Sequence, residues 1–180
     1  MKILKIESKK TWAVVFFLIA IEQFIKIIIN NNFLEKRFAI LPPVLYFEPM
    51  FNRRYSWINS MLQLGDGKWL HIIGVSIMTI LMCLFYNYLN KELGNIKIIN
   101  VMFAFIFSGA ICSLLDKIFW NGSLDYIFVN GLFIFDLKDV YINVFNGLLI
   151  LLVLFNGKGF KQIDDKDIFK GFIKYILRKS

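Results

Sequence analysis

Four aspartates stand where long apolar stretches of this chain begin or end. Asp116 and Asp125 lie in LLDKIFWNGSLDYIF, and Asp136 and Asp139 lie in FDLKDVYINVF. Two carboxylates that meet in a poorly hydrated site cannot both ionise easily, so one of them keeps a proton. Such a pair supplies an acid and a base at once. The four aspartates are therefore candidates for acid and base chemistry near a membrane boundary.

Each of these acids also has a simpler explanation. Asp139 stands at the start of the last apolar segment, where a carboxylate caps a helix and is stabilised by the helix dipole. Asp116 can end the preceding segment, paired with Lys117 or with another cation. Asp125 follows the dipeptide NG, which is typical of turns. No single aspartate indicates an enzyme, although the four together are more suggestive of one.

Three further polar residues interrupt the first apolar segment, in the stretch IEQFIKI. Glu22 and Lys26 are spaced i, i+4 on one helical face, with Gln23 beside them. A charge in a membrane helix costs about 2.5–3.5 kcal/mol on insertion scales. Two interpretations remain open: the charges belong to a polar site or its support, or they pair and extend toward the membrane surface.

The elements that carry these residues are apolar enough to lie in a bilayer. Hydrophobic residues make up 58% of the chain, and its mean hydropathy is +0.61. A transmembrane helix needs roughly 20 mostly apolar residues, and four segments qualify: 12–30, 69–88, 97–115 and 139–156. We therefore expect a mainly α-helical integral membrane protein, with a single four-helix domain over residues 1–156 and a tail over 157–180.

Basic residues indicate how the helices are oriented. Lysines gather in the N-terminal leader, in the turn at 89–96 and in the tail. By the positive-inside rule these parts face the cytoplasm, so both termini are expected there and segments 31–68 and 116–138 outside. The net charge of +8 is then explained by attraction to anionic membrane lipids, and binding of nucleic acid is not expected.

The tail carries its own pattern in DIFKGFIKYILRKS. Apolar residues fall on one helical face, while Lys170, Lys174 and Arg178 recur on another. This pattern predicts an amphipathic helix on the cytoplasmic surface, with a frayed tail as the alternative.

The first outer segment is expected to contain β-structure. Its prolines Pro42, Pro43 and Pro49 exclude a continued helix, and VLYFEPMF and RRYSWINSML resemble short strands or interfacial pieces. Its aromatic residues form either a belt at headgroup level or a platform that receives an extended peptide. They are Tyr46, Phe47, Phe51, Tyr55 and Trp57.

Metal and disulfide chemistry are not expected. His71 is the only histidine, which makes a transition-metal site improbable. Cys83 and Cys112 lie in different apolar segments, and a disulfide would require them to be close neighbours.

Five short stretches follow one another along the chain: IEQFIK, FNRRYSW, SGAICSLLDK, GSLDYI and FDLKDVYI. In this order, and over most of the chain, the sequence resembles the lipoprotein signal peptidase (signal peptidase II) family. Its members are bacterial four-helix intramembrane aspartyl proteases that remove the signal peptide from diacylglyceryl-modified prolipoproteins.

The first three stretches match the family in part. IEQFIK is similar to the family's D-Q-x-x-K, with Glu22 in place of Asp, and FNRRYSW keeps the Asn of N-T-G-A-A-F as Asn52. SGAICSLLDK is similar to G-G-A-I-G-N-L-x-D-R. It keeps Gly109, Ala110, Ile111 and Asp116, with Ser113 in place of Asn and Lys117 in place of Arg.

The last two stretches carry the family's catalytic positions. GSLDYI resembles G-x-V-V-D-F-I and places Asp125 on the first catalytic aspartate. FDLKDVYI resembles F-N-x-A-D-S-x-I and places Asp139 on the second. In that stretch Asp136 replaces Asn, Lys138 replaces Ala and Val140 replaces Ser.

The resemblance implies an aspartyl endopeptidase of the bacterial cytoplasmic membrane, with its active site near the extracytoplasmic face. It needs no cofactor and no metal, and we expect a monomer whose partners are diacylglyceryl-modified prolipoproteins and membrane lipids. Asp125 and Asp139 would be catalytic. The residues expected to bind substrate or support the site are Asn52, Asp116, Lys117, Glu22, Gln23, Lys26, Asp136 and Ser113.

The departures from the family pattern leave alternatives open. If Lys138 points inward, it would favour ionisation of both acids; if it points toward lipid headgroups, the chemistry is unaffected. A non-catalytic paralogue that binds lipidated peptides or regulates another membrane enzyme is therefore the second hypothesis. A transport or proton-relay subunit is a third, disfavoured because segments 69–88 and 97–115 contain almost no ionisable residues.

Overall fold

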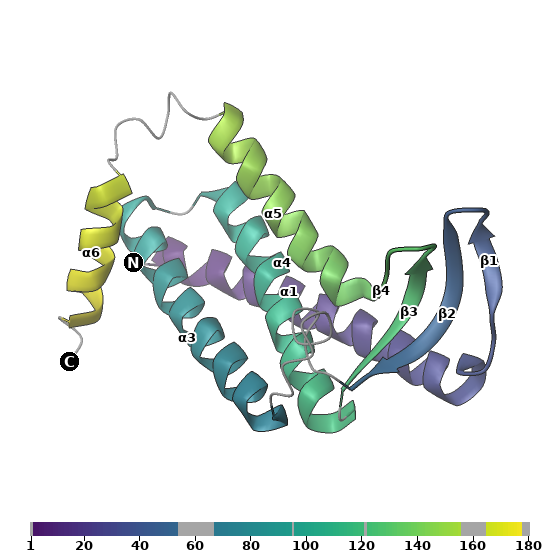
Figure 1. The fold of residues 1–180 in the computed structure, drawn as a ribbon. Coiled ribbons are helices and arrows are strands. Elements are labelled where there is room, and N and C mark those ends of the chain that lie inside the picture. Colours follow the sequence, from purple (N-terminus) through teal and green to yellow (C-terminus); the bar gives the residue numbers. More distant parts are fainter. Residues whose placement is uncertain (1, 54–66, 95, 121, 156–164, 178–180) are drawn as a thin grey trace.

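Four long apolar helices form the body of the protein. A computed structural model describes residues 2–53, 67–94, 96–120, 122–155 and 165–177 (Figure 1). The helices are α1 (Lys2–Ile28), α3 (Lys68–Glu92), α4 (Lys97–Leu115) and α5 (Leu137–Phe155). Short π-helical turns extend α1 as η1 (Ile29–Phe33) and α4 as η2 (Asp116–Trp120). Among the described residues, four helices contain a stretch long and apolar enough to cross a membrane, so the prediction of four such helices is confirmed.

Helix α4 is the central helix of this body. Half of its membrane-crossing window is buried inside the protein, against 11% for α3 and for α5, and it packs against α1, α3 and α5. Small residues line it where its neighbours approach. The hydroxyl of Ser108 lies 3.5 Å from the carbonyl oxygen of Val15 in α1, as expected for membrane helices that pack through small side chains.

Gly109 sets the distance between α4 and α5. A Cβ atom at this position would lie 2.7 Å from Cγ1 of Ile142 and 3.2 Å from the backbone oxygen of Lys138. The two helices therefore approach as closely as a residue without a side chain permits. This contact fixes the first turn of α5, which carries two charged residues of the site.

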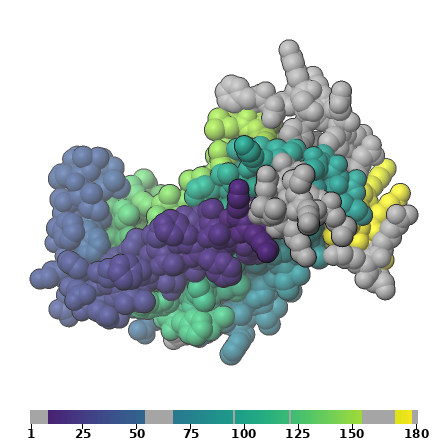
Figure 2. Space-filling model, turned by 180° about the vertical axis from the view of Figure 1, so that it is seen from behind, coloured from purple at the N-terminus to yellow at the C-terminus, as the bar shows by residue number. Residues whose placement is uncertain are grey.

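An antiparallel sheet joins the two outer segments at one end of the helices. Its strands, in spatial order, are β1 (Phe38–Leu41), β2 (Leu45–Asn52), β3 (Ser123–Val129) and β4 (Phe133–Phe135). Figure 2 shows the sheet projecting from the helical body. The expected β-structure between the first two membrane helices is confirmed in β1 and β2. The stretch RRYSWINSML, with Tyr55 and Trp57, lies almost entirely outside the described residues.

The second outer segment differs from its prediction, because Asp125 is not in a turn. It lies within β3, where its partner across the sheet is Met50 of β2. The turn comes earlier, at Gly122, whose φ of +151° is a conformation that residues with side chains rarely adopt. A Cβ at Gly122 would lie 2.7 Å from the backbone oxygen of Asn52, so glycine allows β3 to begin directly against β2.

The amphipathic tail forms α6 (Asp165–Leu177). Its Phe172 packs against Phe85 and Tyr88 of α3, with ring centroids 5.1 and 5.8 Å apart, and Tyr175 also meets Tyr88. In Figure 1, α6 and the N-terminus lie at the end opposite the sheet. The remainder of the predicted tail, residues 157–164 and 178–180, lies outside the described part of the chain, and its position on the membrane surface stays a prediction.

Candidate active site

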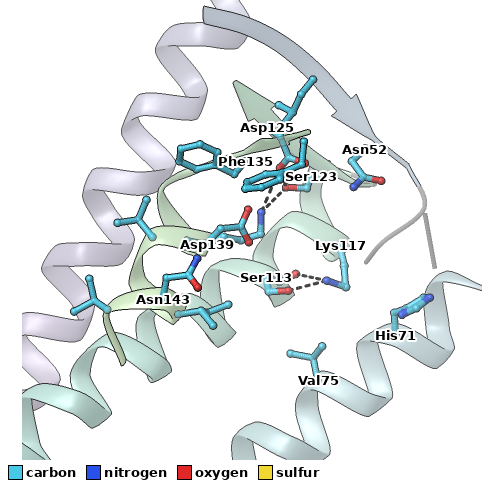
Figure 3. Close-up of a pocket in the computed structure, with 16 residues that line it drawn as sticks. Asn52, His71, Val75, Ser113, Lys117, Ser123, Asp125, Phe135, Asp139 and Asn143 are labelled. Carbon is cyan, nitrogen blue, oxygen red and sulfur yellow. Dashed lines mark hydrogen bonds and ion pairs between the residues drawn. The ribbon is translucent and has the colours of Figure 1, made fainter. Parts of the chain in front are cut away.

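A cavity of about 910 Å³ opens between the sheet and the nearby ends of α3, α4 and α5 (Figure 3). Both aspartates proposed as catalytic line it, Asp125 from β3 and Asp139 from the first turn of α5. Carboxylate oxygens of Asp125, Asp136 and Asp139 lie within 4.8 Å of one another. Two acids that are 14 positions apart in sequence are thus brought face to face by the β3–β4 turn.

Asp139 also has the structural role that its position suggested. The amide of Asp139 donates to Oδ1 of Asp136, and the amide of Asp136 donates to Oδ2 of Asp139, each over 3.3 Å. This reciprocal pair is a capping box at the start of α5. Asp139 therefore takes part in the helix cap, but the N-cap is Asp136 and the helix begins at Leu137, before the predicted start at residue 139. The carboxylate of Asp139 faces the cavity, and this cap fixes its orientation.

Lys26 is the centre of a buried charge cluster behind the cavity. Its ammonium nitrogen lies 2.9 Å from Glu22, 2.6 Å from Asp116 and 2.7 Å from Asp136. All four residues are fully buried within the protein. Glu22 and Lys26 therefore do not extend to the membrane surface; they tie α1 to η2 and to the start of α5.

Lys138 points inward, which decides between the two orientations considered for it. Its ammonium contacts Asp136, and lies 2.6 Å from the hydroxyl of Ser123, 3.3 Å from Asp116 and 3.4 Å from Asp125. The hydroxyl of Ser123 in turn lies 2.6 Å from Oδ1 of Asp125. A cation is therefore built into the wall of the site, in contact with one of its two candidate catalytic acids.

Asp116 takes its cations from other helices and not from its neighbour. It pairs with Lys26 and Lys138, whereas Lys117 donates to Ser113, at 2.7 Å to the hydroxyl and 3.3 Å to the backbone oxygen. Ser113 and Lys117 both line the cavity. The two residues that differ here from the family pattern therefore contact each other.

The remaining predicted residues lie at the edges of the site. Asn52 ends β2 opposite Ser123 and lines the cavity. The side-chain oxygen of Gln23 accepts a hydrogen bond of 3.0 Å from the indole of Trp120, one turn beyond Asp116. Gln23 is thus a neighbour of the buried cluster, outside the cavity wall.

Burial and nearby lysines act in opposite directions on the acids outside the helices. Burial raises the pKa of Asp125 above its ordinary value, and Lys138 and the hydrogen bond from Ser123 offset only part of this increase. Burial acts on Asp136 in the same sense, but Lys138 and Lys26 outweigh it and hold the pKa of Asp136 below its ordinary value. The two lysines therefore favour the ionised form of Asp136, which balances their charge.

Two groups of carboxylates stand close enough together to hold a cation. They are Glu22, Asp116 and Asp136, and Asp125, Asp136 and Asp139. A lysine ammonium already contacts members of each group, Lys26 in the first and Lys138 in the second. The chain thus provides its own positive charge at both places.

Several cavity residues were not predicted from the sequence. Ser123 precedes Asp125 by two positions, so the two share one face of the strand. Asn143 lies one helical turn after Asp139 on α5, and His71 reaches the cavity from α3. The i, i+2 and i, i+4 spacings could have identified the first two, whereas His71 depends on tertiary packing alone.

Comparison with known proteins decides which family this arrangement represents. Residues 14–155 match the family described as Signal peptidase (SPase) II. The chain belongs to the signal peptidase II family. The resemblance noted in the sequence is confirmed, and the protein is a membrane protein of a protease family.

A named relative agrees with this assignment, and two solved structures share the fold. A lipoprotein signal peptidase of Clostridium tetani (strain Massachusetts / E88) is 33% identical over 127 residues, covering 66% of this chain and 79% of the relative. Two structures of a bacterial membrane enzyme, determined by the in meso method, share the fold at 19% identity and a TM-score of 0.67. They cover 84% and 82% of this chain, and 91% and 94% of their own.

Proposed function

We propose that this signal peptidase II family member is an aspartyl endopeptidase, with Asp125 and Asp139 as its catalytic pair. The observation that carries the proposal is the approach of their carboxylates to within 4.8 Å on the wall of one cavity. Two acids at this distance in a buried site favour a state with one shared proton. That state is what hydrolysis of an amide by two carboxyl groups requires.

The proposed reaction needs only water and the two acids. The ionised carboxylate takes a proton from water as the water oxygen attacks the scissile carbonyl carbon, while the protonated carboxyl hydrogen-bonds to the carbonyl oxygen. A proton then passes to the amide nitrogen, the carbon–nitrogen bond breaks, and the new carboxyl terminus and amine separate. The proton taken from the attacking water replaces the one delivered to nitrogen, so the pair again holds one shared proton when the products leave.

The substrates proposed are diacylglyceryl-modified prolipoproteins. The C. tetani relative carries the name lipoprotein signal peptidase, and the cavity lies where the sheet meets the ends of apolar helices. This position suits a peptide whose lipid anchor stays in the bilayer while water reaches the bond. Asn52 and the neighbouring end of β2 would orient the extended peptide, with the cavity on the extracytoplasmic side.

The first experiment is cleavage of a diacylglyceryl-modified prolipoprotein by the purified protein in lipid or detergent. We expect cleavage by the wild type and none by Asp125→Asn or Asp139→Asn, with the loss at least about 10³-fold because the pair acts as a unit. Circular dichroism and thermal unfolding would verify that both variants are folded. Glu35→Gln, an acid-to-amide change at an exposed position outside the cavity, is the matched control and should cleave normally.

The non-catalytic paralogue remains the second candidate, because the buried ammonium of Lys138 lies 3.4 Å from Asp125. A cation at this place favours ionisation of the acids around it, which opposes the shared proton. The same assay separates the two proposals. A folded wild type that binds lipidated peptides without cleaving any of several prolipoproteins would support the paralogue, whereas cleavage that depends on both aspartates would exclude it.

A further inference from the structure

Lys138 acts electrostatically on both catalytic candidates, but the two differ in the hydrogen bonds that they accept. Asp125 receives two donors through one oxygen, the hydroxyl of Ser123 at 2.6 Å and the ammonium of Lys138 at 3.4 Å. Among the hydrogen bonds of the described residues, Asp139 receives only the backbone amide of Asp136 through its side chain. A carboxylate that accepts bonds from charged or hydroxyl donors is stabilised as the anion.

We infer that Lys138, balanced by Asp136, is a positioning residue that keeps Asp125 ionised and leaves the shared proton on Asp139. The inference rests on the proposed function, and it adds the division of labour within the pair. Asp125 is then the base that takes a proton from water, and Asp139 is the acid that faces the scissile carbonyl.

The ion pair between Asp136 and Lys138 compensates the buried charge of the lysine. Both residues are buried, and the ammonium contacts Asp136 as well as Ser123. Asp136 also binds Lys26 at 2.7 Å, so it is anchored from the opposite side. Lys138 thereby has a fixed position and a compensated charge, and it polarises Asp125 without being free to swing into the cavity.

Other titratable groups surround this arrangement and belong to the same electrostatic balance. They are Glu22 and Lys26 of α1, His71 of α3, Cys112 of α4, Asp116 and Lys117 of η2, and Tyr126 of β3. Of these, only Lys117 and His71 line the cavity, together with Asp125, Asp139 and Lys138. Lys117 is bound to Ser113, which leaves Lys138 as the cation in contact with Asp125.

The test is a titration of both aspartates by carbon-13 NMR of side-chain-labelled protein, assigned through Asp125→Asn and Asp139→Asn. In the wild type we expect Asp125 to lose its proton at lower pH than Asp139. In Lys138→Met the midpoint of Asp125 should rise by about 1–3 pH units, the effect of removing a nearby opposite charge. The acidic limb of the cleavage profile should move to higher pH with it.

Two further variants protect the test against misfolding of Lys138→Met. Asp136→Asn should lower the midpoint of Asp125, because Lys138 loses a competing anion, and Asp136→Asn/Lys138→Met should return it toward the wild type. Lys36→Met removes an exposed cation and should change nothing. An unchanged midpoint in Lys138→Met and Asp136→Asn, or loss of the first proton from Asp139, would overturn the inference.

The titration also separates this inference from the proposed function. If the wild type never cleaves, yet Asp125 ionises first and this depends on Lys138, the proposed peptidase activity is excluded and the role of Lys138 is supported. Cleavage that depends on both aspartates, with a pH profile that Lys138→Met does not change, would support the peptidase and exclude the role of Lys138.

Discussion

Single ammonium groups hold together carboxylates that would otherwise repel each other. Lys26 and Lys138 are buried among Glu22, Asp116 and Asp136, and both bind Asp136. Removing one partner of a buried ion pair leaves an uncompensated charge, which costs far more than the pair itself contributes. Substitutions of these residues should therefore affect folding before they affect chemistry.

Lys26→Met is expected to lower the free energy of unfolding by about 3–5 kcal/mol, because Glu22 loses its ion pair and Asp116 and Asp136 keep only Lys138 as a cation among the described residues. Thermal or denaturant unfolding in detergent would measure the change. Lys10→Met, at an exposed position of the same helix, should change stability by less than about 0.5 kcal/mol. Equal effects of the two substitutions would contradict a structural role for Lys26.

Asp136 should make the protein sensitive to acid. Its folded-state pKa is lowered despite burial, because of Lys138 and Lys26, whereas the unfolded value is about 3.9. The resulting stabilisation is present above about pH 4 and is lost as the pH falls toward the lower folded-state pKa. Unfolding measured from pH 7 downward should show this loss below about pH 4, and a smaller one in Asp136→Asn. An equal acid dependence in both proteins would point to other carboxylates.

Two close approaches between elements place the catalytic candidates. Gly109 lets α5 lie against α4, and Gly122 lets β3 start beside the end of β2. The first positions Asp139 and the second positions Asp125, so the separation between the two acids depends on residues that have no side chain.

Gly109→Ala should separate α4 from α5, since the added Cβ would lie 2.7 Å from Ile142. We expect a loss of about 1–3 kcal/mol, typical of overpacking, together with reduced cleavage because the start of α5 moves. Gly147→Ala in α5 is the matched control: its Cβ meets nothing within 4 Å, and it should be neutral or stabilising by up to about 1 kcal/mol. Normal cleavage by a folded Gly109→Ala would show that the helix spacing is not critical.

At the scale of the whole molecule, the sheet and the N-terminus lie at opposite ends of the helical body (Figure 1). The distribution of lysines predicts that the sheet faces outward and the turn between α3 and α4 faces the cytoplasm. The orientation decides on which side of the membrane the cavity opens.

Leu132→Cys in the β3–β4 turn and Glu92→Cys near the end of α3 would test this orientation, in a background with Cys83 and Cys112 replaced by alanine. Both introduced positions are exposed. A membrane-impermeant maleimide should label Leu132→Cys in intact cells and Glu92→Cys only after the membrane is permeabilised. The opposite pattern would invert the predicted topology.

The sequence predicted the helices better than the site, for physical reasons. Twenty-residue apolar runs specify membrane helices by length and composition alone, whereas β3 was missed because its Asp125 and the preceding NG favoured a turn locally. The pairing of that strand with β2 overrides the local preference. The direction of Lys138 was not predictable, because it depends on acids contributed by η2 and β3.

The contacts of Lys26 imply an order of assembly during synthesis. This residue leaves the ribosome with α1, and its nearest early partner is Glu22 on the same helix. Asp116 follows about ninety residues later and Asp136 later still. Because chains fold from the N-terminus as they are made, the i, i+4 pair can carry the first helix into the bilayer as a nearly neutral unit. The cavity then stays incomplete until α5 is synthesised, because α5 contributes Asp139 to its wall.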